Sequence, residues 1–241
     1  MKTRSRHVFW TIGTSAFVLL AILALTVFSL YKGWLRLNYP SEKKYPIRGI
    51  DISHHQGVIK WDKLQASHLD FVVIKATEGG DHEDDRFEDN YDSASAHGYA
   101  VGAYHFYRLC TDVNLQATNF LKSLHDKKMS LAPTVDLEFG GNCQSEFGAE
   151  RTVQNIHVFL QLLEAEIHCK PMLYATKDFY DQYLSGDFAE YPIWIRDVYR
   201  EPHLSDGRPW YIWQFANRAR LPGIKTYVDL NVMAGTMHPI P

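Results

Sequence analysis

The chain has 241 residues, which is enough for one sizeable domain and too few for two comfortable ones. It carries 25 basic and 28 acidic residues, a formal net charge of −3. A mildly acidic chain lacks the positive surface that nucleic-acid binding requires, so we exclude nucleic acid as a partner.

The first thirty residues differ from the rest of the chain in composition. Residues 8–30 form an apolar run without a charged side chain. A helix of this length, rising about 1.5 Å per residue, spans a hydrocarbon core of roughly 30 Å. A cleaved signal peptide usually has a shorter apolar region of about 7–15 residues, and the end of this run is a poor cleavage site. Residues 1–30 are therefore predicted to be a basic cytoplasmic stub and an uncleaved signal anchor, which crosses the lipid bilayer through residues 8–30.

A folded domain is predicted to follow a short linker. Residues 31–46, interrupted by Pro40 and Pro46, are interpreted as the juxtamembrane linker, and residues 47–241 as the domain. Several apolar runs in this domain have the character of strands buried on both faces of a parallel sheet. Eight strands are predicted, at residues 49–53, 70–78, 100–108, 131–138, 171–177, 192–196, 210–216 and 227–233.

Amphipathic stretches separate the early strands. Helices are predicted at residues 87–98, 112–128 and 149–168, with a shorter one within 177–191. The last two gaps, 197–209 and 217–226, are too short for full helices. The sequence therefore predicts an α/β fold, a single irregular TIM-like barrel with eight strands and about five helices, preceded by one transmembrane helix.

Two acidic residues end the fourth predicted strand. Asp136 and Glu138 lie two residues apart, so their side chains point to the same face, separated by roughly 7 Å. Active sites of such barrels form at the C-terminal ends of the strands. Two close carboxyls beside apolar walls tend to have different pKa values, so that one is protonated and the other ionised. Hydrolysis of a glycosidic bond requires one acid and one anion of this kind. A bare Asp-x-Glu, however, is more often the solvated end of a strand.

Two further acids strengthen the functional interpretation. Asp51 lies in the first predicted strand and Asp229 in the last, and these strands are neighbours in a closed barrel. An acid within an apolar strand is costly unless it is paired or functional. Three strands that each carry such an acid therefore predict a shared acidic cleft.

From Gly49 onward the sequence resembles glycoside hydrolase family 25, the Chalaropsis-type lysozymes. The matching segments occur in the family's order over nearly all of residues 49–235. They are GIDISHHQGVIKWDKLQ, FVVIKATEG, NYDSASAHGYAVGAYHFYR, the Asp-Leu-Glu motif, IWQFA and VDLNVM. The resemblance implies an eight-stranded barrel with about five helices. It also implies hydrolysis, with retention, of the β-1,4 bond from N-acetylmuramic acid to N-acetylglucosamine in peptidoglycan.

The resemblance further implies roles for the four acids. Glu138 becomes the general acid/base. Asp136 acts either as the nucleophile or by orienting the acetamido group of the substrate. Asp51 and Asp229 complete the acidic cluster and tune its pKa values. The family needs no cofactor, and the histidines in the motifs do not have the spacing of a metal site.

Four more residues are candidates for substrate binding: Tyr104, Tyr174, Trp194 and Gln214. Aromatic side chains near strand ends stack on sugar rings or hydrogen-bond to them, although core packing explains each of them equally well.

The sequence departs from the family pattern in three places. His55 stands where the family often has Trp. The sixth strand reads Ile-Trp-Ile-Arg-Asp, which leaves the role of Trp194 open. Residues 81–86 are unusually charged and are predicted to form a solvated loop.

Cys110 follows the third predicted strand and Cys143 the fourth, so both are expected at the mouth of the barrel. We therefore predict a disulfide between them, with three buried thiols as the alternative. Cys169 precedes the fifth strand, at the opposite end.

Taken together, these features predict a membrane-anchored muramidase with its monomeric barrel on the periplasmic or extracellular side. The alternative is a catalytically inactive peptidoglycan-binding or scaffold protein on the same fold. The presence of all four acids favours the enzyme.

Overall fold

The structure, a computed structural model, describes residues 2–35, 38–145 and 147–236, with residues 2–9 and 11 described by their backbone alone. The chain divides into two compact units, one up to Leu37 and one from Asn38 onward.

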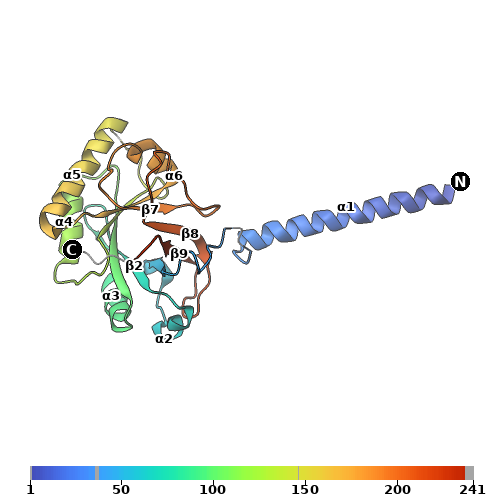
Figure 1. The fold of residues 1–241 in the computed structure, drawn as a ribbon, viewed down its shortest axis with the longest axis horizontal. Coiled ribbons are helices and arrows are strands. Elements are labelled where there is room, and N and C mark those ends of the chain that lie inside the picture. The colour runs from blue at the N-terminus through green and yellow to red at the C-terminus, as the bar shows by residue number, and fades with distance from the viewer. Residues whose placement is uncertain (1, 36–37, 146, 237–241) are drawn as a thin grey trace. The chain divides into compact units, whose positions relative to one another are not determined.

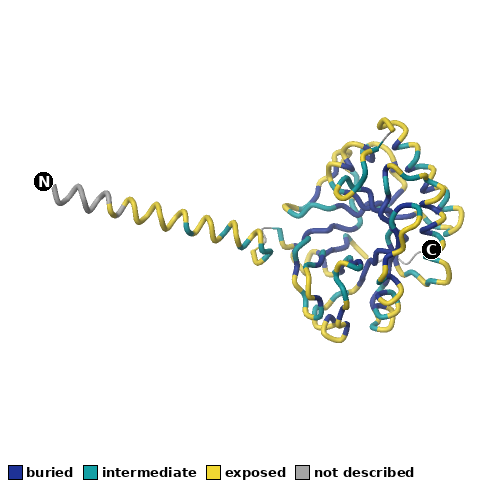
Figure 2. The backbone as a smooth tube through the Cα atoms, turned by 180° about the vertical axis from the view of Figure 1, so that it is seen from behind, coloured by how far each residue is buried: buried dark blue, intermediate teal, exposed yellow. Residues whose placement is uncertain are grey.

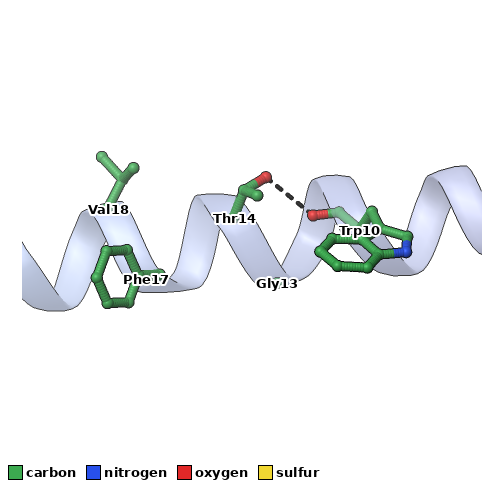
Figure 3. Close-up of a pocket in the computed structure, with 5 residues that line it drawn as sticks. All are labelled: Trp10, Gly13, Thr14, Phe17 and Val18. Carbon is green, nitrogen blue, oxygen red and sulfur yellow. Dashed lines mark hydrogen bonds between the residues drawn. The ribbon is translucent and has the colours of Figure 1, made fainter.

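The first unit consists of helix α1 (Lys2–Tyr31) and the turn that ends it. Its segment Ile12–Tyr31 has a mean hydropathy of 2.2, which makes it long and apolar enough to cross a membrane. The hydroxyls of Thr14 and Thr26 donate to backbone carbonyls of the same helix. Figure 3 shows the hydrogen bond from the Thr14 hydroxyl to the carbonyl of Trp10. Its length is 2.9 Å. Gly13, which has no side chain, is the residue before Thr14. Such internal bonding is what a hydrocarbon environment demands.

The second unit is a closed barrel (Figure 1). Its eight strands are β1 (Arg48–Ile52), β2 (Phe71–Glu78), β4 (Ala100–Phe106), β5 (Thr134–Leu137), β6 (Met172–Thr176), β7 (Ile193–Arg196), β8 (Ile212–Ala219) and β9 (Val228–Met233). They follow the order β1-β9-β8-β7-β6-β5-β4-β2, and the pairing of β1 with β2 closes the ring. A two-residue strand that the sequence did not predict, β3 (His82–Glu83), pairs antiparallel with the end of β2. The predicted eight-stranded barrel is confirmed.

Strand β9 is antiparallel to both of its neighbours, β1 and β8, which corrects the expectation of a parallel sheet. The connection 220–227 is too short for a parallel crossover, which needs about a dozen residues or more. The start of β9 therefore lies at the same end of the barrel as the C-terminal ends of the parallel strands. In this register Asp229 is directly opposite Asp51.

Helices cover the outside of most of the barrel. They are α2 (Trp61–Leu64), α3 (Phe87–Ala96), α4 (Val113–Leu124), α5 (Ala149–Ile167) and α6 (Lys177–Phe179), which continues into a π-helical turn at Tyr180–Leu184. The predicted helices correspond to α3 to α6, whereas α2 was not predicted. Asp112 starts α4 by accepting hydrogen bonds from the backbone N–H of Asn114 and Leu115 at 2.9 and 3.2 Å.

The barrel has two apolar layers. Figure 2 shows the buried strands at the centre of this unit. One layer lies between the sheet and the helices. The other fills the interior and consists of Phe71, Val73, Leu131, Met172, Tyr174, Trp194, Ile212 and Met233. Gly49 is required at the floor of the interior, because a Cβ there would lie 2.4 Å from the ring of Phe71. The interior is thus packed below the acidic residues rather than hollow.

Residues 38–46, the later part of the predicted linker 31–46, belong to the barrel unit. Asn38 donates to the carbonyl of Phe215 at 2.9 Å, and the ring of Tyr39 packs edge-on against Phe215. Tyr45 is buried against Trp210, and its hydroxyl donates to Glu201 at 2.6 Å. No long helix follows α5 among the described residues, and residues 38–46 cover the outer face of β8.

Candidate active site

All eight site residues predicted from the sequence line one small pocket at the mouth of the barrel. They are Asp51, Tyr104, Asp136, Glu138, Tyr174, Trp194, Gln214 and Asp229. The barrel brings them together from seven strands, β1, β4, β5, β6, β7, β8 and β9. The pocket has a volume of about 80 Å³.

Strand alternation places the two central acids. Asp136 pairs with Phe106 of β4 on one side and with Tyr174 of β6 on the other. Leu137 is fully buried on the opposite face, in the layer beneath the helices. Asp136 is 8% exposed, and its Oδ1 has no hydrogen-bond partner within the described residues. Asp136 also lines the pocket.

The surroundings of these acids disfavour their ionised forms. Burial raises the pKa of Asp136 well above its ordinary value, and the neighbouring Glu138 and Asp51 raise it further. Burial likewise raises the pKa of Glu138 to about 7, with Arg196 lowering it and Asp51 raising it. Two close carboxyls in such a site do not ionise together readily. Glu138 thus exchanges a proton near neutral pH, as a general acid/base must.

Asp51 is held by a network of hydrogen bonds from neighbouring strands. Gln214 Nε2 donates to both of its carboxyl oxygens, at 3.0 and 3.2 Å, and Asn231 Nδ2 donates to Oδ1 at 2.7 Å. The hydroxyl of Tyr174 donates to Gln214 Oε1 at 3.1 Å, and Trp194 Nε1 donates to Asn231 Oδ1 at 2.8 Å. Trp194 is 2% exposed, so it supports this network from the interior, and it has little surface for stacking on a sugar.

Burial raises the pKa of Asp51, and hydrogen bonds from Asn231 and Gln214 partly offset that effect. Burial also raises the pKa of Asp229 well above its ordinary value, and Asp51 raises it further. Asp51 is therefore held as a hydrogen-bond acceptor, whereas Asp229 takes up a proton more readily.

Three polar residues of the site were not predicted from the sequence. Asn231 is fully buried and lies two residues after Asp229, so the alternation of β9 offered a signal for it. Arg196 ends β7 and favours the ionised form of all four acids. Lys75 is buried near the end of β2, with its Nζ 2.6 Å from Glu78 Oε2. Both cations lie in segments that the sequence identified without giving these residues a role.

The charged segment 81–86 differs from the predicted solvated loop at the short strand β3 and at Asp84. Its other acids are exposed, but Asp84 is buried and accepts hydrogen bonds from the backbone N–H of His54 at 3.0 Å and from Arg86 at 3.0 Å. The ring Nδ1 of His54 lies 2.7 Å from the same carboxyl. Asp84 therefore joins this segment to the loop after β1. No group of three His, Cys, Asp or Glu side chains suited to a metal ion is found in the described part of the chain.

Cys110 and Cys143, the pair expected at the mouth of the barrel, form a disulfide with a Cα–Cα distance of 6.0 Å. The bond joins the loop after β4 to the loop after β5. Cys169 is a free thiol.

Comparison with known proteins places this barrel in a family. The sequence profile of glycosyl hydrolases family 25 matches residues 50–224. The chain belongs to glycosyl hydrolases family 25. Family membership confirms the resemblance seen in the motifs from Gly49 onward.

Relatives within family 25 match most of the chain. It is 31% identical over 201 residues to the uncharacterized protein YegX of Escherichia coli K12, covering 81% of this chain and 72% of YegX. It is 29% identical over 202 residues to Lysozyme M1 of Streptomyces globisporus, covering 79% of this chain and 68% of that protein. The solved family 25 glycosyl hydrolase of Bacillus anthracis has a TM-score of 0.77 at 34% identity, covering 84% of this chain and 95% of its own.

Proposed function

We propose that the protein is an N-acetylmuramidase, a lysozyme that hydrolyses the β-1,4 bond between N-acetylmuramic acid and N-acetylglucosamine in peptidoglycan with retention of configuration. The observation that carries the proposal is the pair Asp136 and Glu138, which share one pocket of a family 25 barrel, with the pKa of Glu138 raised to about 7 by burial. The name of Lysozyme M1 supports the same substrate class.

Glu138 donates its proton to the glycosidic oxygen as the bond breaks and later takes a proton from the attacking water. Asp136 acts on the other side of the anomeric carbon, either forming a covalent bond to it or orienting the substrate's acetamido group. Lys75 and Arg196 favour the ionised form of Asp136 that either role requires. No cofactor enters this scheme, in which one monomeric barrel suffices.

The test of this function is release of dye-labelled fragments from peptidoglycan by the full chain in detergent. We expect new reducing ends on N-acetylmuramic acid, because hydrolysis occurs on its glycosidic bond. Binding to peptidoglycan without release would instead favour the inactive scaffold on the same fold.

The pH dependence of the reaction follows from the same carboxyl. Glu138 must be protonated to donate, so kcat/KM is expected to fall as pH rises through about 7, where its pKa lies. Arg196 lowers this pKa, so Arg196→Gln is expected to raise it and to move the alkaline limb to higher pH. Arg196→Lys keeps the charge and serves as the matched control. A limb that moves to lower pH in Arg196→Gln would contradict this role for Arg196.

We also propose that α1 anchors the enzyme in the membrane, with the barrel on the periplasmic or extracellular side where peptidoglycan lies. The support is the apolar segment Ile12–Tyr31, none of which is buried within the protein. The chain is expected to stay in the membrane pellet through alkaline carbonate extraction and to retain its N-terminus. Recovery of a shortened chain in the soluble fraction would show instead that α1 is a cleaved signal.

A further inference from the structure

The loop that follows the two central acids is joined to the loop after β4 by one side chain. Asn142 Nδ2 donates to the carbonyl of Glu138 at 2.9 Å and to the carbonyl of Tyr107 at 2.8 Å. Its Oδ1 accepts from the backbone N–H of Leu109 at 3.0 Å and of Cys143 at 2.9 Å. This single amide therefore ties the backbone of Glu138 to the end of β4.

Covalent and ionic contacts reinforce the same connection. The Cys110–Cys143 disulfide lies directly after Asn142 and joins the same two loops across 33 residues of sequence. Arg108 Nη1 donates to the carbonyl of Gly141 at 2.8 Å and contacts Glu78 Oε1 at 3.3 Å. We call Asn142, its four hydrogen bonds and the adjacent disulfide the loop junction.

We propose that the loop junction positions Glu138 for proton transfer, so that the activity of the enzyme depends on oxidation of Cys110 and Cys143. The inference rests on the proposed muramidase function. Glu138 follows the last residue of β5, so beyond the strand its backbone is held through its own carbonyl, by Asn142. A misplacement of about 1 Å at a reacting group costs up to about 100-fold in rate. Asn142 is a positioning residue here, because it acts through Glu138 and does not touch the reacting atoms.

The disulfide is open to chemical control. Cys110 is exposed to solvent, so a thiol reductant reaches it. Bond formation removes two electrons and two protons from the Cys110 and Cys143 thiols. The electrons and protons pass to another disulfide, such as oxidised glutathione, which is thereby reduced to two thiols. An oxidising compartment outside the cytoplasm therefore completes the junction, and reducing conditions open it.

The test compares two substrates in the full chain. Peptidoglycan needs a proton on its leaving oxygen, whereas an aryl glycoside with an activated phenol needs almost none. In Asn142→Ala, and in wild type treated with dithiothreitol, kcat/KM on peptidoglycan is expected to fall about 10- to 100-fold. On the aryl glycoside it is expected to change less than about threefold, because proton donation matters little there. Cys169→Ser, which keeps the junction, is expected to match wild type in both redox states.

Hydrogen exchange separates this inference from the proposed function. The amides of residues 138–143 are expected to exchange faster in Asn142→Ala, in the double variant Cys110→Ser/Cys143→Ser and in reduced wild type. If wild type showed this dependence of exchange on reduction and yet had no activity even when oxidised, that result would defeat the muramidase proposal and leave the loop junction in place. Equal losses on both substrates, or unchanged exchange after reduction, would overturn the positioning role.

Discussion

Replacing Glu138 by Gln is expected to lower kcat/KM on peptidoglycan by about 10²–10⁴-fold, the usual contribution of a general acid or base. The substitution keeps the shape of the side chain and removes the proton that the leaving oxygen needs. Its effect on folding is expected to be small and favourable, because burial raises the pKa of Glu138 and thus disfavours its ionised form at neutral pH.

An activated aryl glycoside distinguishes the role of Glu138 from a general loss of structure. Its phenol leaves without a proton, so Glu138→Gln is expected to retain most of the wild-type kcat/KM on this substrate. Glu166→Gln, on the exposed surface of α5, is the matched control and is expected to match wild type on both substrates. If Glu138→Gln released dye from peptidoglycan at the wild-type rate, its assignment as the acid would be wrong.

Asp136→Asn is expected to lower kcat/KM on both substrates, by about 10²–10³-fold, the cost of removing one preorganised electrostatic group. The reason is that Asp136 acts on the anomeric carbon, whose developing charge does not depend on how the leaving group departs. Loss on both substrates, against selective loss in Glu138→Gln, separates the roles of the two acids. Asp92→Asn, on the exposed face of α3, is the matched control.

The same substitution is expected to stabilise the fold above neutral pH. Burial raises the pKa of Asp136 above its value in the unfolded chain, so wild type loses stability as pH rises through the folded-state pKa. Asn cannot ionise and escapes that loss. The melting temperature of Asp136→Asn minus that of wild type is therefore expected to be larger at pH 8 than at pH 4. The expected increase is a few degrees, which corresponds to a change of ~1 kcal/mol in the free energy of unfolding. A lower relative value at pH 8 would show that Asp136 is stabilised as an anion.

The two roles left open for Asp136 are distinguished by a fluorinated muramyl substrate that slows the second step. A covalent adduct on Asp136, found by mass spectrometry of its peptide, identifies the nucleophile. A protein that turns over this class of substrate without an adduct supports orientation of the acetamido group instead.

Much of the site was predictable because strand geometry is local. Alternation along one strand is enough to place Asp136 and Glu138 on one face and Leu137 on the other, and the structure agrees. The uncharged run at residues 8–30 likewise contains its own signal, since an apolar helix longer than a bilayer core needs no tertiary partner to be recognised. The family motifs added the expectation that these strands form one eight-stranded barrel.

Other features were decided only by the closed barrel. Asn231 donates to Asp51 across 180 residues of sequence, a contact that exists only because β9 runs antiparallel beside β1. Residues 31–46, interrupted by Pro40 and Pro46, are predicted to be a linker, and within them Asn38 and Tyr39 contact Phe215 of β8. The raised pKa of Glu138 depends mainly on burial, which a strand pattern does not measure.

Sequence patterns were therefore enough to predict which side chains share a face, where the eight barrel strands and the longer helices lie, and which family the barrel belongs to. These properties follow from backbone periodicity and from short motifs. The direction of β9, the hydrogen bonds that hold Asp51 and the attachment of Glu138 to Asn142 became visible only in the folded barrel. Each of these depends on packing between residues far apart in the chain, and such packing is set when the barrel closes.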